Sequence, residues 1–226
     1  MRPLIIMNGE KIDWFHTVIR MLMYLAGVAV LALGMSLQTA SSLGVAALTC
    51  FATTLSMLTG KTLGFWIAAT YVAYIVAQFT ILRREFQPRI LLELCFSTLI
   101  GGFTDFFMAV NPLHPAAPPI QVETMLLSLA VTAFGVSLVV NMGVVPNAPD
   151  GLVQVIAEKI KRRFGDVKVV FDCSHVAVSL VLSLALMHNL GGFGVTTAIS
   201  ALFLGHVINI ANKLFAQRFV RAAFGK

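Results

Sequence analysis

The fifth apolar stretch of the sequence carries the side chains best suited to chemistry. Four polar residues recur there at intervals of three or four positions: Lys168, Asp172, His175 and Ser179. This spacing places them on one face of an α-helix. In an apolar setting a carboxylate can take up a proton or a cation, and an imidazole changes charge near neutral pH. The pattern predicts a solute or proton site, and the alternative is a Lys168–Asp172 ion pair that only fixes helix packing.

Residues 146–151 mark the strongest break in the chain, because proline and glycine bracket two polar side chains, Asn147 and Asp150. Asp150 is predicted to be the N-cap of a short helix, since a carboxylate at that position accepts hydrogen bonds from free backbone N–H groups. One interpretation is an amphipathic helix lying at the cytoplasmic face of a membrane. The other is a half-helix that dips inward, so that Asn141, Asn147 and Asp150 line a cavity.

Two further polar residues occupy matching positions near the ends of the third and sixth apolar stretches. Asp105 follows Gly101, and Asn209 follows Gly205, in each case by four residues. Asp105 lies near the outer end of its stretch, where solvation at the membrane interface is an alternative explanation. The candidate substrate-binding residues all carry polar side chains within or beside apolar stretches: Asp105, Ser137, Asn141, Asn147, Asp150, Lys168, Asp172, His175 and Asn209.

A membrane-embedded fold must position these side chains. Hydrophobic residues make up 58% of the chain, charged residues make up 12%, and the mean hydropathy is +0.88. Soluble domains are about half apolar and about a quarter charged. Crossing the hydrocarbon layer takes about 20 helical residues, and six stretches are long enough: residues 17–38, 62–82, 89–110, 122–142, 168–187 and 193–214. Two others, 43–58 and 150–164, are too short or too charged to cross and are predicted to be re-entrant or interfacial.

The distribution of basic residues predicts the orientation. If the six long stretches cross and the N-terminus is cytoplasmic, all but one of the 16 Lys and Arg residues fall on or beside the cytoplasmic side, and the exception is Lys61. This is the positive-inside pattern, which places both termini in the cytoplasm. If the two short stretches also crossed, Arg83 and Arg84 would be exported. Orientation thus explains the net charge of +6, and no nucleic-acid partner is expected.

The sequence contains an internal repeat. Residues 29–37 read AVLALGMSL and residues 130–138 read AVTAFGVSL, which agree at six of nine positions. Small residues also recur wherever membrane helices pack closely, so part of this match has a second explanation. Each half holds three spans, an odd number, and the halves must therefore enter the bilayer from opposite sides. The prediction is one all-α integral membrane domain, 1–226, with inverted repeats at about 17–110 and 122–214.

The second half resembles the YczE/YyaS/YitT-type group of bacterial integral membrane proteins. The resemblance is carried by Pro149-Asp150-Gly151-Leu152, by Val167-Lys168-Val169 and by Phe171-Asp172, and more loosely by Gly101 to Asp105 in the first half. The first half has Val45-Ala46 where the family usually has Ser-Pro. The resemblance covers most of the chain and implies a helical protein of the bacterial cytoplasmic membrane; it implies no particular activity.

No chemistry of another kind is indicated. Cys50, Cys95 and Cys173 lie in apolar stretches without metal-ligand spacing, so they are expected to be buried thiols. The sequence contains no protease, phosphate-binding or nucleotide-binding motif. We therefore expect no cofactor, no metal and no enzymatic activity.

Together these features predict a small-solute transporter, coupled to a proton or cation gradient, with its site between the two halves. Inverted repeats with interrupted helices recur in secondary transporters. Two alternatives stay open at this point. One is a vitamin-binding membrane subunit of an ATP-driven importer, and the other is a regulatory or scaffold protein whose polar residues only pack helices. The partners would be the lipid bilayer and a small molecule or ion, and the sequence leaves a homo-oligomer open.

Overall fold

The computed structural model of this protein describes residues 14–83, 88–113, 115–145, 147–188, 190 and 192–224. Within these residues the chain is helical and contains no strand. The α-helices are α1 (Trp14–Ala40), α2 (Ala47–Thr59), α3 (Leu63–Leu82), α4 (Leu92–Val110), α5 (Pro118–Met142), α6 (Ala148–Lys159), α7 (Phe164–Leu182) and α8 (Val195–Phe224). A short 3-10 turn, Pro88–Leu91, precedes α4, and a π-helical segment, Ser183–Met187, continues α7.

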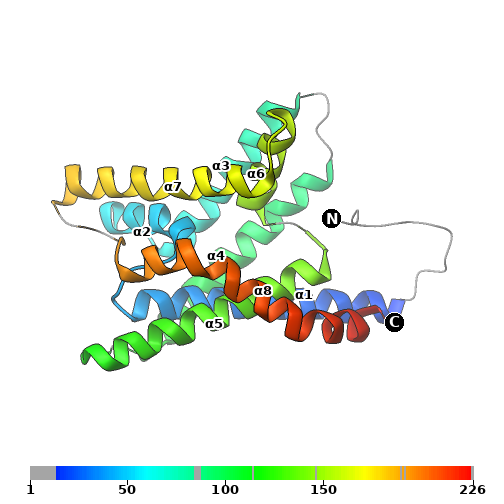
Figure 1. Ribbon diagram of the computed structural model, residues 1–226, viewed down its shortest axis with the longest axis horizontal. Helices are drawn as coiled ribbons and strands as arrows, with labels where there is room; N and C mark the ends of the chain where they lie inside the picture. Colours follow the sequence, from blue (N-terminus) through cyan, green and yellow to red (C-terminus); the bar gives the residue numbers. More distant parts are fainter. Residues whose placement is uncertain are drawn as a thin grey trace.

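Six of these helices are long and apolar enough to cross a membrane: α1, α3, α4, α5, α7 with its continuation, and α8. They coincide with the six predicted spans, and α2 and α6 are the two predicted short segments. Some boundaries differ: α8 continues to Phe224 rather than ending near residue 214, α5 begins at Pro118 rather than near 122, and α6 ends at Lys159 rather than near 164. Figure 1 shows α1, α4 and α7 running in one direction and α3, α5 and α8 in the other. The start of α1 and the end of α8 therefore lie at the same end of the bundle.

α1 and α5 cross at the centre of the bundle, and small residues at the crossing allow their backbones to approach closely. A β-carbon on Gly34 would lie 2.8 Å from the backbone nitrogen of Thr132, and one on Gly135 would lie 2.6 Å from that of Leu31. Glycine at such positions lets two helix backbones approach. The largest buried apolar side chains pack around this crossing: Tyr24, Ile67, Phe96, Ile100 and Met142.

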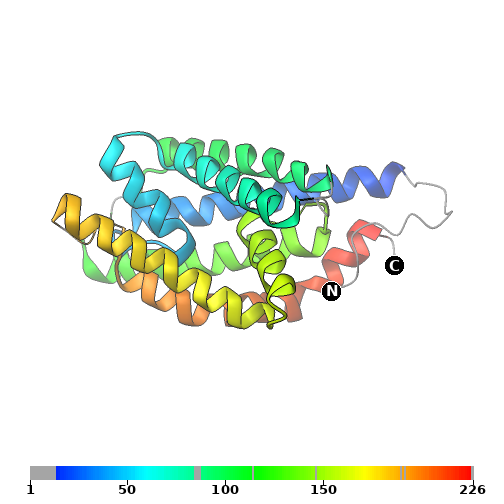
Figure 2. The same ribbon diagram turned by 90° about the horizontal axis from the view of Figure 1, so that it is seen from above.

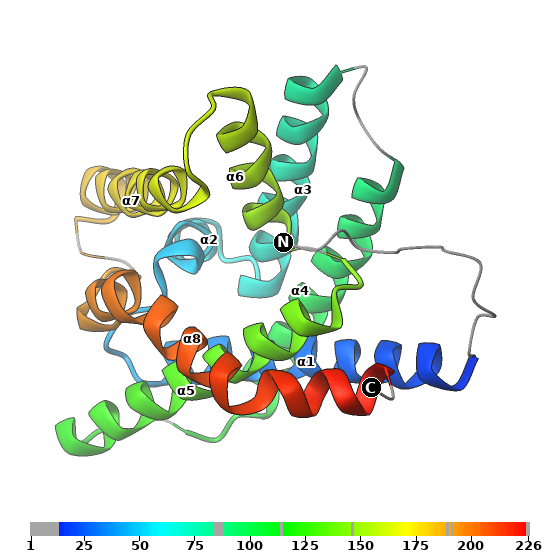
Figure 3. The same cartoon turned by 45° about the vertical axis from the view of Figure 1, so that its right-hand side comes forward.

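The remaining helices pack around α1 and α5 in a largely reciprocal way: many contacts recur when α1, α2, α3 and α4 are exchanged with α5, α6, α7 and α8. α4 lies against α1, and α8 lies against α5. α2 packs on α3 and α7, and α6 packs on α7 and α3. The pattern is incomplete. α3 packs along α4, and α8 also contacts α1 and α2, whereas in the described part of the chain α7 does not pack along α8 and α4 does not pack along α5 or α6. Figures 2 and 3 show the first turns of α8 near α7 and α2, while the rest of α8 runs to the opposite end of the molecule.

The buried side chain of Gln38 positions α2. Its amide oxygen accepts a hydrogen bond from the backbone N–H of Ala46, just before α2, at 2.9 Å, and its amide nitrogen donates to Thr132 at 3.1 Å. The connection from α1 to α2 also bonds the connection from α7 to α8, through the N–H of Val45 and the carbonyl of Gly192 at 3.1 Å. The first short helix is thus tied to both halves.

Candidate functional site

Lys168 on α7 forms two ion pairs, and the one with Asp150 joins α7 to α6. The Nζ atom of Lys168 lies 3.0 Å from Oδ1 of Asp150 and 3.1 Å from Oδ1 of Asp172. The Lys168 and Asp172 side chains are each 23% exposed, so the pairs are partly shielded from solvent. The structure contains the Lys168–Asp172 pair that the sequence offered as an alternative, and it adds a second carboxylate from α6. The ammonium of Lys168 is therefore held between two acids.

The prediction that Asp150 is the N-cap of the short helix is wrong. The cap position is Asn147, whose side chain makes no capping hydrogen bond, and α6 begins at Ala148. The helix starts earlier than predicted because a proline such as Pro149 is well accommodated in the first turn, where no intrahelical N–H is required. Asp150 then lies inside the first turn. Its carboxylate is free to pair with Lys168 instead of binding backbone N–H groups. Pro146, at the predicted break, lies outside the described residues.

A hydrogen bond between Tyr74 and His175 connects α3 to α7. The Tyr74 hydroxyl lies 2.6 Å from Nε2 of His175, and Nδ1 of the same ring lies 2.8 Å from the carbonyl oxygen of Phe171. A carbonyl only accepts, so Nδ1 carries the hydrogen and, in the neutral ring, Nε2 accepts from the tyrosine hydroxyl. The Phe171 and Tyr74 rings pack around the imidazole. His175 is therefore fixed between the first and second halves.

A third carboxylic acid, which the sequence reasoning did not single out, is buried behind this cluster. Glu93 on α4 is 1% exposed, and its Oε2 accepts a hydrogen bond from Nε2 of Gln78 on α3 at 2.7 Å. The same amide nitrogen lies 3.4 Å from the carbonyl oxygen of Ala148 at the start of α6. An acidic residue in a predicted span is a functional candidate by default, and that rule alone would have identified Glu93.

Two further buried polar groups lie beside the cluster. The hydroxyl of Tyr71, which is 3% exposed, is placed to hydrogen-bond the side chain of Asn147 at the start of α6. Together with the three carboxyls of Asp150, Asp172 and Glu93 and the one ammonium, they make a site rich in acceptors. Its excess of acidic groups suits a proton or a cationic solute.

Other predicted site residues lie in separate places. Ser137 and Asn141 on α5 both contact Asn212 on α8: its Oδ1 accepts from the Ser137 hydroxyl at 2.5 Å and from the Asn141 amide at 2.8 Å. Asn209, the residue that the repeat alignment selected, is exposed on α8. The register of α8 therefore brings Asn212, three residues further on, to α5. The sequence reasoning missed Asn212.

Asp105 caps a helix at the other end of the bundle. Its carboxylate accepts hydrogen bonds from the backbone N–H of Gly64 and from the hydroxyl of Thr62, both at 2.7 Å. The first of these gives a partner to a free N–H group at the start of α3. It also lines an open groove of about 410 Å³ with residues of α1, α2, α3 and α4. Ser179, the last residue of the predicted polar face, bonds Thr54 on α2 at 2.7 Å.

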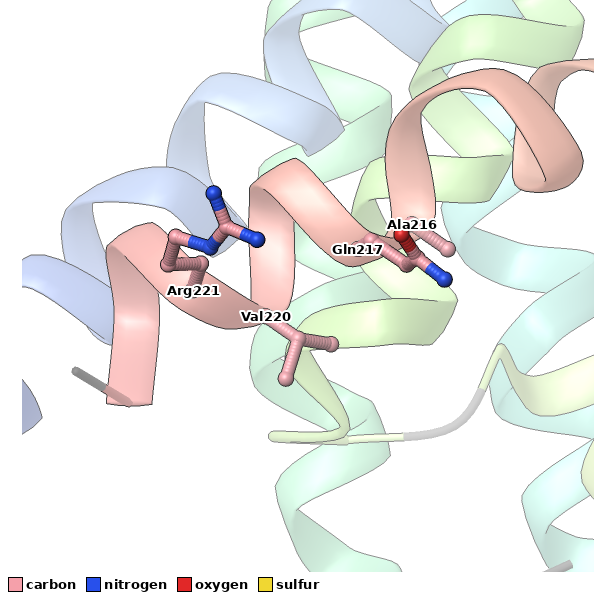
Figure 4. A pocket seen from close by; sticks show the side chains of 4 residues that line it. All are labelled: Ala216, Gln217, Val220 and Arg221. Carbon is pink, nitrogen blue, oxygen red and sulfur yellow. The ribbon is translucent and has the colours of Figure 1, made fainter. Parts of the chain in front are cut away.

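A shallow hollow on the surface lies away from the acidic cluster. It measures about 460 Å³ and is lined by four residues near the end of α8: Ala216, Gln217, Val220 and Arg221. Figure 4 shows that all four come from this one helix and that the Gln217 and Arg221 side chains point in different directions. A hollow on one helix surface, without converging polar groups, is a poor solute site.

The cysteines also differ from expectation. Cys50 is buried, as predicted, but Cys95 on α4 and Cys173 on α7 are exposed on the outside of the bundle. A helix within the bilayer can expose apolar side chains to lipid as well as bury them in the protein. The apolar character of a cysteine therefore does not reveal which of the two surfaces it faces. Among the described residues, no group of three His, Cys, Asp or Glu residues is placed to hold a metal ion.

Six long apolar helices with an acidic cluster between α3, α4, α6 and α7 define a polytopic α-helical membrane protein. The chain belongs to the Family of unknown function (DUF6198), whose pattern matches residues 18–213. It is 32% identical over 147 residues to the "Uncharacterized membrane protein YczE" of Bacillus subtilis (strain 168). That match covers 63% of this chain and 65% of the relative's length. No solved structure matches the chain. The resemblance to YczE-type membrane proteins is confirmed.

Proposed function

We propose that the protein is a small-solute membrane transporter and not an enzyme, and that the acidic cluster is its site. The observation that carries this proposal is the origin of the cluster's residues. Tyr74, Gln78 and Glu93 come from the first half of the chain, while Asp150 and Asp172 come from the second. A polar site between two halves of a helical bundle is where secondary transporters hold their cargo.

The proposal includes an inverted repeat of about residues 17–110 and 122–214. Reciprocal contacts support it. The alignment of the two halves pairs Gly34 with Gly135 and Leu31 with Thr132, and Gly34 contacts Thr132 just as Gly135 contacts Leu31. The helix pairs α2–α7 and α6–α3, and likewise α1–α4 and α5–α8, exchange in the same way. The opposite directions of α1 and α5 in Figure 1 also agree with it. Two such halves can exchange conformations, which is the basis of alternating access.

The cluster's chemistry favours a cationic solute or a proton. Asp150 and Asp172 already bind an ammonium, that of Lys168, and a solute carrying a primary amine or a metal cation would meet the same carboxylates. We place the protein in the bacterial cytoplasmic membrane with both termini in the cytoplasm, because that orientation satisfies the positive-inside rule. The acidic cluster then lies toward the cytoplasmic side of the bundle.

The direct test is a current measurement on proteoliposomes adsorbed to a solid-supported membrane. Na⁺, K⁺, ethylamine and putrescine would be applied in turn, with and without an imposed proton gradient. We expect at least one of these cations to produce a current with the wild-type protein. Asp172→Asn should abolish it, because it removes one of the two carboxylates that would receive the cation.

The matched control is Asp166→Asn, which makes the same change at an exposed position in the first turn of α7. Its current should equal that of the wild type. An unaltered current in Asp172→Asn would remove Asp172 from the site. A protein that carries no current with any of these cations, yet retains a small molecule without a gradient, would instead favour the binding-subunit alternative.

The orientation has its own test, through single cysteines placed in a chain that lacks Cys50, Cys95 and Cys173. Arg83→Cys and Lys161→Cys should be labelled by an impermeant maleimide only after the cell is opened, whereas Lys61→Cys should be labelled in intact cells. Residues 83 and 161 labelled from opposite sides would overturn the six-span inverted repeat and with it the transport proposal.

A further inference from the structure

Glu93 is a buried acid that forms no ion pair with another described residue. Its side chain is 1% exposed and accepts one hydrogen bond from a side chain, that of the neutral amide of Gln78. In the described part of the chain, no Lys, Arg or His lies within ion-pair distance of its carboxyl. Lys168 is engaged by Asp150 and Asp172 instead. An ionised carboxylate is costly in such surroundings unless it is neutralised.

The groups around Glu93 on α1 and on its own helix supply no neutralising charge. On α1, the Tyr24 hydroxyl points to the carbonyl of Val145 at 3.4 Å, and the Arg20 guanidinium donates to two carbonyls at the C-terminal end of α5. On α4, Cys95 is a thiol exposed on the outside of the bundle. These groups leave the carboxyl dependent on Gln78 and on α6.

The first turn of α6 forms the wall of the site. A β-carbon on Gly151 would lie 2.8 Å from Oε1 of Glu93 and 3.2 Å from the Gln78 amide oxygen. The neighbouring residue, Asp150, is itself an acid and disfavours a second negative charge nearby. The helix N-terminus carries about half an elementary positive charge, which is too little to balance a full one.

We propose that Glu93 is a proton-binding site whose proton is released when α6 moves. The carboxylic O–H bond breaks, the proton passes to water, and a carboxylate remains. Gly151 follows Asp150 directly, so a movement of α6 away from α4 and α7 that separates Asp150 from Lys168 also withdraws the wall beside Glu93 and admits water. The use of this proton to drive transport rests on the function proposed above, whereas the existence of the site does not.

Infrared spectroscopy of the purified protein in detergent tests the site without any transport assay. Protein labelled with [13C]glutamate should show, at neutral pH, the carbonyl stretch of a protonated carboxylic acid at the frequency of the labelled group. Glu93→Gln should lack this band. Glu158→Gln, the same change at an exposed position on α6, should keep it.

A second variant keeps the test decisive if Glu93→Gln does not fold. Changing Glu10, Glu85, Glu123 and Glu158 to glutamine leaves Glu93 as the only glutamate, and the band should persist. A spectrum with ionised carboxylates alone, or a band that survives in Glu93→Gln, would overturn the proposal whether or not the protein transports anything.

The link to α6 is tested by hydrogen–deuterium exchange of the same band. Lys168→Met releases Asp150, so water should reach Glu93 more often and the band should shift to its deuterated frequency several-fold faster than in the wild type. Lys61→Met, a lysine at the other end of the bundle, is the control and should leave the rate unchanged. Equal exchange rates in Lys168→Met and the wild type would refute the coupling to α6.

Discussion

The two short helices make corresponding contacts, but the contact of α2 is made by uncharged groups and that of α6 by charged groups. α6 packs on α3 and α7, and α2 packs on α7 and α3. At α2 the contact is neutral: Oγ of Ser179 lies 2.7 Å from the Thr54 hydroxyl and 3.1 Å from the Cys50 thiol. At α6 the contact consists of the ion pairs of Lys168 and the buried acid Glu93.

Under the proposed transport function, this difference identifies the contact on which a proton or a cation would act. Hydroxyl groups donate and accept at once, so a cluster such as Thr54 and Ser179 satisfies itself without any change of charge. The α6 contact holds two carboxylates around one ammonium, so a proton or a cation that binds there alters its charge. If the halves do exchange conformations, the α6 end would be the one that a cation controls, and the α2 end would follow.

The largest effect should come from unbalancing the charged contact. Lys168→Met leaves the carboxylates of Asp150 and Asp172 close together without their ammonium. We expect a loss of about 3 kcal/mol in the free energy of unfolding, since removing one partner of a shielded ion pair strands the other. Thermal unfolding in detergent micelles measures it.

Two further variants separate charge from packing in that experiment. Lys168→Met combined with Asp172→Asn should regain part of the lost stability, because one stranded carboxylate has gone. Lys61→Met should have little effect, as its lysine lies over the Phe65 ring at the opposite end of the bundle. If Lys168→Met is as stable as the wild type, the α6 contact does not depend on charge and the comparison fails.

The next effect concerns the fit of α6 against the buried acid. Gly151→Ala places a methyl group 2.8 Å from Oε1 of Glu93 and 3.3 Å from Nε2 of Gln78. Overpacking of this kind should cost about 2 kcal/mol, measured by the same unfolding assay. The matched control is Gly102→Ala on α4, where a new β-carbon meets nothing within 4 Å. Equal stability of the two variants would show that α6 is not held tightly there.

A smaller effect is expected at the neutral contact. Ser179→Ala removes the hydroxyl that bonds both Thr54 and Cys50, and a hydrogen bond contributes about 1 kcal/mol net. Ser174→Ala, at an exposed position of the same helix where the hydroxyl donates to the carbonyl of Phe171 in the preceding turn, should have almost no effect. A loss for Ser179→Ala as large as that for Lys168→Met would contradict the ranking of the two contacts.

The sequence predicts much of the fold because lipid imposes a local rule. A segment that crosses the bilayer must satisfy its backbone within itself and be apolar throughout, so length and composition alone identify the six spans. The Lys168–Asp172 pair is local as well, since the residues lie four apart on one helix. Alternation of helix directions follows from counting spans, and Figure 1 shows it.

The rest depends on tertiary packing, which spacing does not reveal. Gln78 and Glu93 are single residues on different helices, and only the packing of α3 on α4 brings them together. The choice of Asn212 over Asn209 depends on how α8 is rotated against α5. The alignment of Gly205 with Gly101 carries no information about that rotation. Asp150 was misassigned because the start of α6 depends on what Pro149 permits in its first turn.

The smallest effect is expected from changing the thiol at the neutral contact. Cys50→Ser replaces a weak hydrogen-bonding group by a hydroxyl of similar size beside Ser179, so the free energy of unfolding should change by less than about 0.5 kcal/mol. Cys50→Asp, in contrast, would introduce at α2 the kind of charge that α6 carries, without a lysine to receive it. That variant should be severely destabilised. If Cys50→Asp were tolerated, the α2 contact would already be open to water or cations, and the neutral and charged ends of the molecule would have to be regarded as equivalent.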